Sequence, residues 1–288
     1  TACEIYQCDW SSDVCSSDLE IFKAQIGERV RSWIFTSATL SVGGDFGHYA
    51  RQMGLSEAQA RSWESPFNYA ENSLLYVPRD MPEPNTPTYT EAVVNAALPA
   101  IKSSAGRAFM LFTSLRAMRE GYDRLKEAFA RSGLDYPLLM QGEGSRTDLL
   151  ERFRRLGNAV LVGSQSFWEG VDVRGEALSL VVIDKLPFAA PDDPLLAARI
   201  EKINRDGGNA FVEYQLPQAV ITLKQGAGRL IRDETDRGVL MICDPRLFSK
   251  SYGKKILRSL PSMKGTRKID DVIGFFERGA VNAQANAD

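Results

Sequence analysis

Short apolar runs alternate with amphipathic segments along most of the chain. Beyond residue 70 the apolar runs are nearly continuous, as expected of strands buried on both faces of a sheet. The strands predicted from them are residues 73–77, 107–112, 136–140, 159–163, 178–184 and 238–243. Apolar strands that alternate with amphipathic helices predict an α/β fold, with a parallel sheet and helices on both faces.

Helices are predicted between these strands from apolar spacing and from start signals. Ser114 and Ser145 are placed to cap two of them, and a proline stands in the first turn of another. The predicted helices are residues 46–53, 89–103 with a stop or kink at Pro99, one after Ser114, one after Ser145, 194–204, and one that begins at Pro217. One more strand is predicted earlier, at residues 30–36.

Polar, glycine-bearing stretches follow several of the predicted strands. They are Thr113-Ser114, Gln141-Gly142, residues 164–172, 185–188 and 244–246. Ligands of parallel α/β sheets bind at the carboxyl ends of the strands, so these stretches are candidate binding loops.

The loop after residue 112 and the loop after residue 163 each allow two interpretations. Thr113 and Ser114 place hydroxyls and helix-start amides where a backbone phosphate could bind, although helix capping also explains them. Phe167 and Trp168 could stack on bases or pack beneath their own loop.

Arg229 and Arg232 follow Gln225, Gly226 and Gly228 in the stretch 223–232. Residues three apart share one face of a helix, and the helix that begins at Pro217 is predicted to carry both arginines. Rigid, permanently charged guanidinium groups suit the charge that develops on a phosphoryl group in transfer. A solvated end of an amphipathic helix is the plainer interpretation.

Composition places the chain among ordinary soluble proteins. Of its 288 residues 44% are hydrophobic and 25% charged, with no uninterrupted apolar run long enough for a membrane span. The start carries no secretory signal pattern, so we expect a cytoplasmic protein with no membrane partner. The net charge is −2, but residues 246–268 hold eight Lys or Arg and no acid. That stretch could meet phosphates or an acidic partner, or form a solvated basic face.

No metal site is predicted. Cys3, Cys8 and Cys15 fit no ligand spacing, and Cys243 ends an apolar run as a small buried hydrophobe would. The single histidine, His48, excludes a histidine-based triad or a histidine-rich metal site. We expect neither a GxxxxGK[ST] phosphate loop nor an acidic DExH or DExD box, so the chain alone should lack the parts that bind Mg-ATP.

Residues 1–19 have neither helical nor strand periodicity and contain the near-repeat Ser-Ser-Asp. They resemble translated sequencing-adapter sequence. We therefore expect them to be non-native and exclude them from the interpretation of the fold.

Several short stretches together resemble the motifs of one family. The stretch 36–40 (TSATL) resembles helicase motif III, 111–114 (LFTS) motif IV, 163–172 (GSQSFWEGVD) motif V and 225–232 (QGAGRLIR) motif VI. The stretches 185–188 (KLPF) and 243–247 (CDPRL) add to the match. In this order and spacing they resemble the C-terminal part of the DinG/YoaA branch of the XPD-like superfamily 2 DNA helicases, from about residue 20 to about residue 275.

The resemblance implies a pair of RecA-like motor domains with ATP and Mg²⁺ in the cleft between them. Residues 20–45 would hold the last strand and motif III of motor domain 1, residues 46–275 motor domain 2, and residues 276–288 a disordered tail. The phosphate-loop lysine, the acidic box and, in most members, an iron–sulfur cluster would belong to motor domain 1. The three early cysteines do not correspond to that cluster.

Roles for individual residues also come from the resemblance alone. Arg229 and Arg232 would be arginine fingers for the γ-phosphate, and Gln225 would contact the γ-phosphate or the attacking water. The remaining roles would be nucleotide contact for Gly170, Asp172 and Gly228, single-stranded DNA contact for Thr113, Ser114, Ser164, Ser166 and Trp168, and coupling between the two sites for Ser37 and Thr39.

Two functions follow, with different requirements. The first is the motor half of an ATP-dependent 5′–3′ DNA helicase in DNA repair or replication, inactive by itself. The second is a non-catalytic module that binds single-stranded DNA or a replication protein, such as the chi subunit of DNA polymerase III that pairs with the YoaA branch. An unrelated nucleotide-binding enzyme is disfavoured because no GxGxxG occurs.

Overall fold

The structure is a computed structural model that describes residues 32–37, 39–55, 57–164, 167, 177–189 and 193–285. Residues 1–19 lie outside this description. So do the predicted site residues Ser166, Trp168, Gly170 and Asp172.

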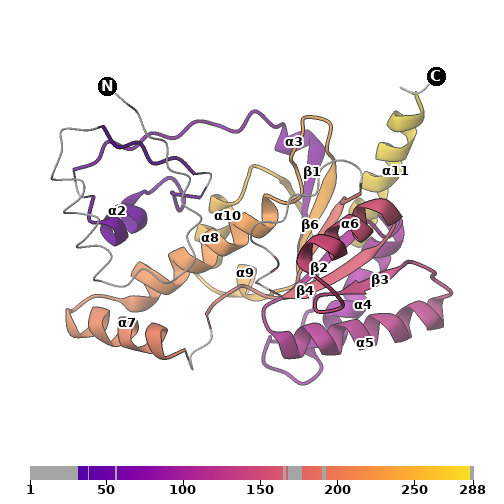
Figure 1. Ribbon diagram of the computed structural model, residues 1–288, viewed down its shortest axis with the longest axis horizontal. Helices are drawn as coiled ribbons and strands as arrows, with labels where there is room; N and C mark the ends of the chain where they lie inside the picture. The colour runs from indigo at the N-terminus through magenta and orange to yellow at the C-terminus, as the bar shows by residue number, and fades with distance from the viewer. Residues whose placement is uncertain are drawn as a thin grey trace. The chain divides into compact units, whose positions relative to one another are not determined.

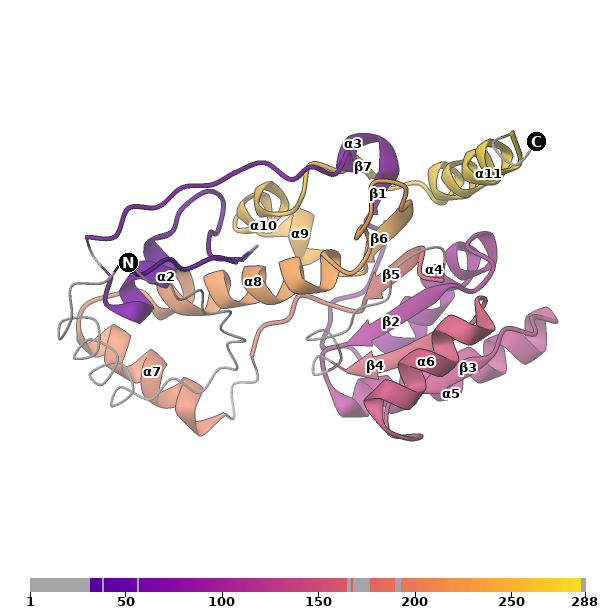
Figure 2. The same ribbon diagram turned by 45° about the horizontal axis from the view of Figure 1, so that its top comes forward.

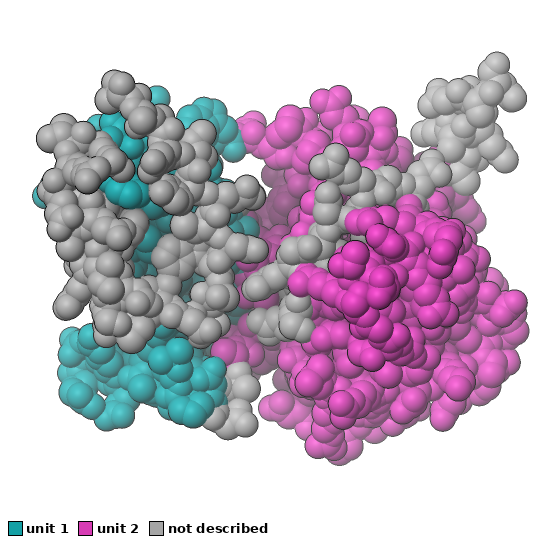
Figure 3. All heavy atoms as spheres, in the orientation of Figure 1, with its two compact units in different colours: residues 1–63, 191–221 teal, residues 64–190, 222–288 magenta. Residues whose placement is uncertain are grey.

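The chain forms two compact units. One contains residues 1–63 and 191–221, and the other contains residues 64–190 and 222–288 (Figure 3). The boundary predicted at residue 46 does not coincide with this division, and residues 191–221 leave the sheet-forming unit. We call the two parts the small unit and the sheet unit and describe each by itself.

The small unit is helical in the part that the structure describes. It contains α2 (Gly47–Met53), α7 (Pro194–Arg205), a π-helix (Phe211–Gln215) and the first residues of α8 (Leu216–Ala227). Pro194 occupies the first position of α7, as the sequence predicted, and Asp193 caps the helix. His48 of α2 is buried, with Nδ1 3.0 Å from the carbonyl oxygen of Glu213.

The predicted strand at residues 30–36 is wrong for the residues that the structure describes. Residues 32–37 form no strand, and only Ile34 makes a bridge contact. A strand needs hydrogen bonds to neighbouring strands, and residues 32–37 are not among the seven strands that make up the sheet. Apolar composition alone therefore does not make a strand here.

The sheet unit is built on seven strands in the order β3-β4-β2-β5-β6-β1-β7, and every neighbouring pair is parallel (Figures 1 and 2). Their bounds are β1 Ser73–Tyr76, β2 Ala108–Phe112, β3 Leu138–Met140, β4 Val160–Ser164, β5 Leu180–Ile183, β6 Gly238–Ile242 and β7 Lys264–Thr266. The first six coincide with predicted strands, and the parallel α/β architecture is confirmed. All seven carboxyl ends consequently lie along one edge of the sheet.

Helices pack on both faces of this sheet. On one face α4 (Tyr89–Ser103), α5 (Leu115–Ser132) and α11 (Ile269–Ala285) bury a core that includes Val94, Met110, Leu125 and Val272. On the other face, Phe153 of α6 (Arg146–Leu156) packs on Phe109 of β2, with ring centroids 4.8 Å apart. Pro99 lies inside α4 and does not end it. The remaining short helices are α3 (Tyr69–Asn72), α9 (Arg246–Ser249) and α10 (Gly253–Ser259).

Two features at the C-terminal end differ from the prediction. The edge strand β7 was not predicted, because Lys264, Gly265 and Thr266 carry no strand pattern and lie at least partly exposed. Helix α11 continues to Ala285, so the disordered tail predicted from residue 276 is wrong as far as 285. Val272 and Phe275 explain the helix, since both side chains are buried in the core.

Gly121 sets how closely α5 approaches the sheet. A Cβ atom at this position would lie 2.2 Å from Cζ of Phe112, which is itself fully buried. We expect Gly121→Ala to lower the free energy of unfolding by about 1–3 kcal/mol, because the ring has no room to move. Gly274→Ala in α11 is the matched control, since its Cβ would meet only the flexible Arg278 side chain. Urea unfolding measures both, and equal stabilities of the two variants would contradict this packing.

Candidate nucleotide and nucleic-acid sites

The structure corrects how the two arginines of motif VI are held. Helix α8 ends at Ala227, so Arg229 and Arg232 lie in the segment that follows it and not on one helical face. The chain leaves the helix at Gly228, whose N–H donates to the carbonyl oxygen of Lys224 at 2.8 Å. Leu230 and Ile231, in the segment after the helix, are each only 2% exposed, so this segment is packed into the unit.

A compact turn fixes the backbone beside Arg232. Asp236 Oδ2 accepts hydrogen bonds from the N–H groups of Arg232, at 2.8 Å, and Asp233, at 2.9 Å. Asp233 Oδ1 accepts from the N–H and the hydroxyl of Thr235. The Arg232 side chain is half-buried, so it projects from a backbone that its neighbours hold in place.

The same turn corrects a prediction about acidic motifs. Residues 233–236 read Asp-Glu-Thr-Asp, so the letters of a DExD box do occur in the chain. They follow the arginines, and both aspartates accept hydrogen bonds within the turn. Their position and their bonding identify them as turn residues and give no support for a magnesium site.

Motif VI lies at the amino edge of the sheet. The side chain of Leu230 packs against Gly238, the first residue of β6. Asn72, just before β1, donates from Nδ2 to the carbonyl oxygen of Glu234 at 2.9 Å. Burial raises the pKa of the nearby Tyr69. A hydrogen bond with Ser65 and the positive charge of Arg232 act on this pKa in the opposite direction, but their effect is smaller. The arginines therefore stand at the edge opposite the carboxyl-end loops.

The motif VI residues form a donor set that fits a polyphosphate. Within one short stretch, Gln225 supplies an amide group, and Arg229 and Arg232 supply two permanently charged guanidinium groups. All three residues are partly accessible to solvent. Burial lowers the pKa of the neighbouring Lys224. Among the residues that the structure describes, no group of three or more His, Cys, Asp or Glu could hold a metal ion.

At the carboxyl edge, Asp184 holds Thr113. The Asp184 carboxylate accepts the Thr113 N–H at 3.0 Å and lies 3.3 Å from the Thr113 hydroxyl. Asp184 is 2% exposed, and burial raises its pKa to about 7 against the favourable effect of Lys185. Both Thr113 donors are thus directed inward. Thr113 positions the loop in this structure and does not present these donors to a phosphate outside it.

Ser114 and Ser164 differ in whether their hydroxyl groups remain available to a phosphate outside the loop. Ser114 is exposed, and its hydroxyl oxygen accepts the Ala117 N–H at 3.2 Å, which caps α5. The hydroxyl proton of Ser114 can therefore still point to an anion. Ser164 is buried, and its N–H and hydroxyl both donate to Oε1 of Gln141, at 2.7 and 3.0 Å.

The other predicted site residues that the structure describes have local roles. Phe167 is buried beside Gly163, which agrees with the interpretation that it packs as a core residue, while Trp168 lies outside the described residues. In the small unit, the Ser37 and Thr39 hydroxyls lie 3.2 Å apart, and the Thr39 N–H donates to Ser37 Oγ. This local turn neither supports nor excludes a coupling role.

Sequence reasoning missed a buried polar network that ties the carboxyl-edge loops together. The Tyr89 hydroxyl donates to the carbonyl oxygens of Asp184, at 2.7 Å, and Cys243, at 3.2 Å. Asp244, with no exposed surface, accepts the Leu186 N–H at 2.8 Å and pairs with Arg246 at 2.6 Å. The sequence does contain a signal for this network, an acidic residue (Asp184 or Asp244) at the end of each of two buried strands. A buried carboxylate requires hydrogen-bond partners.

The fold and these loops define a RecA-like α/β domain. Residues 97–263 match the helicase C-terminal domain family, so the chain belongs to that family. The predicted resemblance to DinG/YoaA helicases is likewise confirmed. The chain is 51% identical to the ATP-dependent DNA helicase YoaA of Haemophilus influenzae over 89% of its length, and 50% identical to YoaA of Escherichia coli over 88%. It is 37% identical to the ATP-dependent helicase DinG of Mycobacterium tuberculosis over 93%.

These relatives are longer than the chain. It spans 39% of the length of both YoaA proteins and 40% of DinG. A solved XPD helicase structure superposes with a TM-score of 0.60 at 22% identity, over 86% of this chain and 45% of the other. That likeness supports the fold. No described helix is long and apolar enough to cross a membrane.

Proposed function

We propose that the chain is the C-terminal motor half of an ATP-dependent 5′–3′ DNA helicase that acts in DNA repair or replication. The observation that carries the proposal is the motif VI segment, in which Gln225, Arg229 and Arg232 follow the end of α8 on a backbone fixed by Asp236. YoaA and DinG, at 50% and 37% identity, are named as helicases and support it.

In this proposal the chain supplies only part of an ATPase. ATP, held with Mg²⁺ mainly by motor domain 1, supplies the phosphoryl group that is transferred to water. Arg229 and Arg232 would stabilise the charge on that group, and Gln225 would orient the attacking water. Gly228, together with Gly170 and Asp172 outside the described residues, would line the nucleotide. The chain alone should not hydrolyse ATP.

Single-stranded DNA would bind at the carboxyl edge, opposite the arginines. Ser114 is the strongest described candidate for phosphate contact, because its proton is available and it begins a helix. Thr113 and Ser164 would shape the loops, while Ser166 and Trp168 keep their proposed contacts. Ser37 and Thr39 would couple the nucleotide state to DNA binding. The chi subunit of DNA polymerase III is the partner proposed from the YoaA resemblance, and an iron–sulfur cluster would belong to motor domain 1.

The proposal is tested with the full-length protein on a forked DNA duplex. We expect ATP hydrolysis that depends on single-stranded DNA, and unwinding of a duplex with a 5′ tail in preference to one with a 3′ tail. Single-stranded DNA binding with no hydrolysis by the full-length protein would favour the non-catalytic binding module instead.

Ser114→Asp separates DNA contact from helix capping. Aspartate caps helices as well as serine does, but its charge repels a phosphate. We expect single-stranded DNA to bind about tenfold more weakly, the effect of roughly 1.4 kcal/mol. Ser114→Asn is the control, because asparagine caps a helix as well as aspartate does but carries no charge. Fluorescence anisotropy with labelled oligo-dT measures both, and equal affinities would remove Ser114 from the DNA site.

A further inference from the structure

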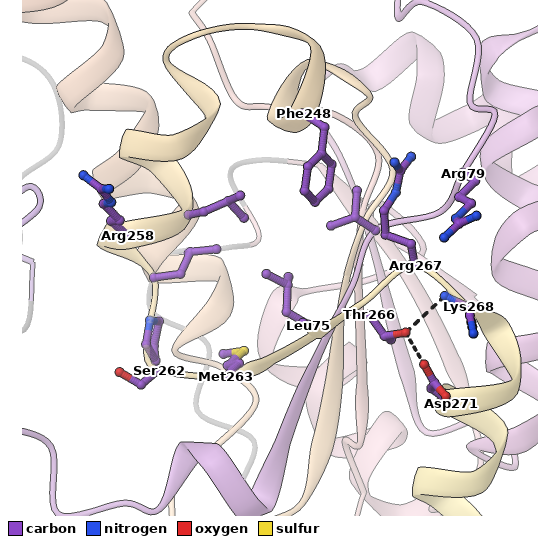
Figure 4. Close-up of a pocket in the computed structure, with 15 residues that line it drawn as sticks. Leu75, Arg79, Phe248, Arg258, Ser262, Met263, Thr266, Arg267, Lys268 and Asp271 are labelled. Carbon is purple, nitrogen blue, oxygen red and sulfur yellow. Dashed lines mark hydrogen bonds between the residues drawn. The ribbon is translucent and has the colours of Figure 1, made fainter.

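A cavity of about 620 Å³ lies in the sheet unit beside the edge strand β7 (Figure 4). Side chains from β1, α9, α10, β7 and the start of α11 line it. It contains none of the residues of the proposed nucleotide and DNA sites. Nothing in the proposed helicase mechanism accounts for it.

The cavity combines an apolar floor with a basic rim. The floor includes Leu75, Leu257, Leu260 and Met263, and Phe248 projects beside it with 53% of its surface exposed. Four cationic side chains surround it, all of them exposed: Arg79, Arg258, Arg267 and Lys268. Within the described part of the chain, Asp271 is the only acidic residue of the lining, and Thr266 already donates a hydrogen bond to that carboxylate. The charges therefore favour an anionic occupant.

The outer edge of β7 adds a second recognition element. This strand is the last in the sheet and pairs with β1 on one side only. Edge strands present backbone N–H and C=O groups to which an extended peptide can pair. Gly265, in the middle of β7, lines the cavity, and a Cβ atom there would meet nothing within 4 Å. The face of the strand at Gly265 is therefore open to the cavity.

The lining favours a peptide over a nucleic acid. Binding of single-stranded nucleic acid relies on aromatic rings on which bases stack. Phe248 is the only aromatic residue among the described residues that line the cavity, and the Arg267 guanidinium lies over its ring at 4.7 Å from the centroid. The other floor residues are aliphatic or Met, which accept the side chains of a peptide but do not stack on bases.

We propose that this cavity is a docking site for an extended segment of a partner protein in which acidic and apolar residues alternate. Alternate residues of an extended peptide point to opposite sides, so its apolar residues face the floor while its carboxylates reach Arg258, Arg267 and Lys268. The site is separate from the proposed ATPase, and its function does not depend on Arg229 or Arg232.

The test uses the full-length protein and a short fluorescein-labelled peptide in which glutamate alternates with leucine. Gly265→Leu adds a side chain to the cavity at a position where a Cβ atom would meet nothing within 4 Å, and we expect it to weaken peptide binding by about tenfold or more. Arg258→Glu should weaken it by a similar factor, while Lys254→Glu, on the same helix but outside the cavity, should change it less than about twofold. DNA-stimulated ATP hydrolysis should stay unchanged in all three variants.

The outcomes separate the alternatives. Equal affinities of Arg258→Glu, Lys254→Glu and the unmodified protein for the glutamate–leucine peptide would overturn the proposal. So would equal binding of a lysine–leucine peptide, because recognition would then not depend on charge. Variants that weaken binding of labelled oligo-dT and leave peptide binding unchanged would assign the cavity to nucleic acid instead.

Discussion

Replacing Arg232 with alanine in the full-length protein is expected to reduce DNA-stimulated ATP hydrolysis by about 10³- to 10⁵-fold, the effect of removing an arginine finger. The half-buried guanidinium follows α8 on a turn whose bonds to Asp236 come from backbone N–H groups. Alanine keeps those N–H groups, so the fold should survive. Arg232→Lys should recover little activity, because an ammonium group keeps the charge but loses the planar fork.

The control for this prediction is Arg131→Ala, at the exposed last turn of α5. Steady-state ATP hydrolysis with saturating oligo-dT compares the variants, and thermal unfolding checks that each is folded. Near-normal hydrolysis by a folded Arg232→Ala protein would remove Arg232 from the ATPase.

Asp184→Asn is expected to change how stability depends on pH. Burial raises the pKa of Asp184 to about 7 in the folded protein, from an ordinary value of 3.8. The folded state then binds the proton more tightly than the unfolded state, so this group makes the protein less stable as pH rises from about 4 to about 7. The loss, roughly 1 to 4 kcal/mol, is complete above the folded pKa. Asparagine does not titrate, and its amide oxygen can still accept the Thr113 N–H.

Urea unfolding at a series of pH values between about 5.5 and 8 measures this effect. Ordinary carboxyl groups are already ionised in this range and contribute little to the slope. The unmodified protein should lose stability across the series, and Asp184→Asn should lose much less. The pKa of Cys243, which also lies near Asp184, is raised above its ordinary value by burial and does not interfere. Equal slopes for both proteins would mean that Asp184 titrates normally.

The sequence predicted the central sheet well because buried parallel strands are apolar throughout. Residues such as Leu180 and Val239 have no exposed surface, so their apolar character and their position in the sheet follow from the same burial. The polar stretches after β2, β5 and β6 were also placed correctly, since a strand stops where its side chains no longer face a core. The order and spacing of the motifs along the chain indicated the family.

Features that depend on distant partners were missed. Residues 32–36 have strand composition but form no strand, and β7 is a strand although its residues carry no strand pattern. The end of α8 follows from burial of Leu230 against Gly238, a contact that local helical spacing does not contain. Thr113 and Ser164 looked accessible in the sequence, but Asp184 and Gln141 engage their donors from elsewhere in the fold. The cavity beside β7 likewise collects residues from five separate elements.

The most direct test of the central claim is steady-state ATP hydrolysis by this chain alone, compared with the full-length protein, both with saturating single-stranded DNA. Circular dichroism on the same samples establishes that the chain is folded. We predict DNA-stimulated turnover by the full-length protein and none by the folded chain, because in the proposed function Arg229 and Arg232 complete a site whose phosphate loop would belong to motor domain 1. DNA-stimulated hydrolysis by the chain alone, lost in its Arg232→Ala variant, would contradict this account by showing a complete ATPase within these residues.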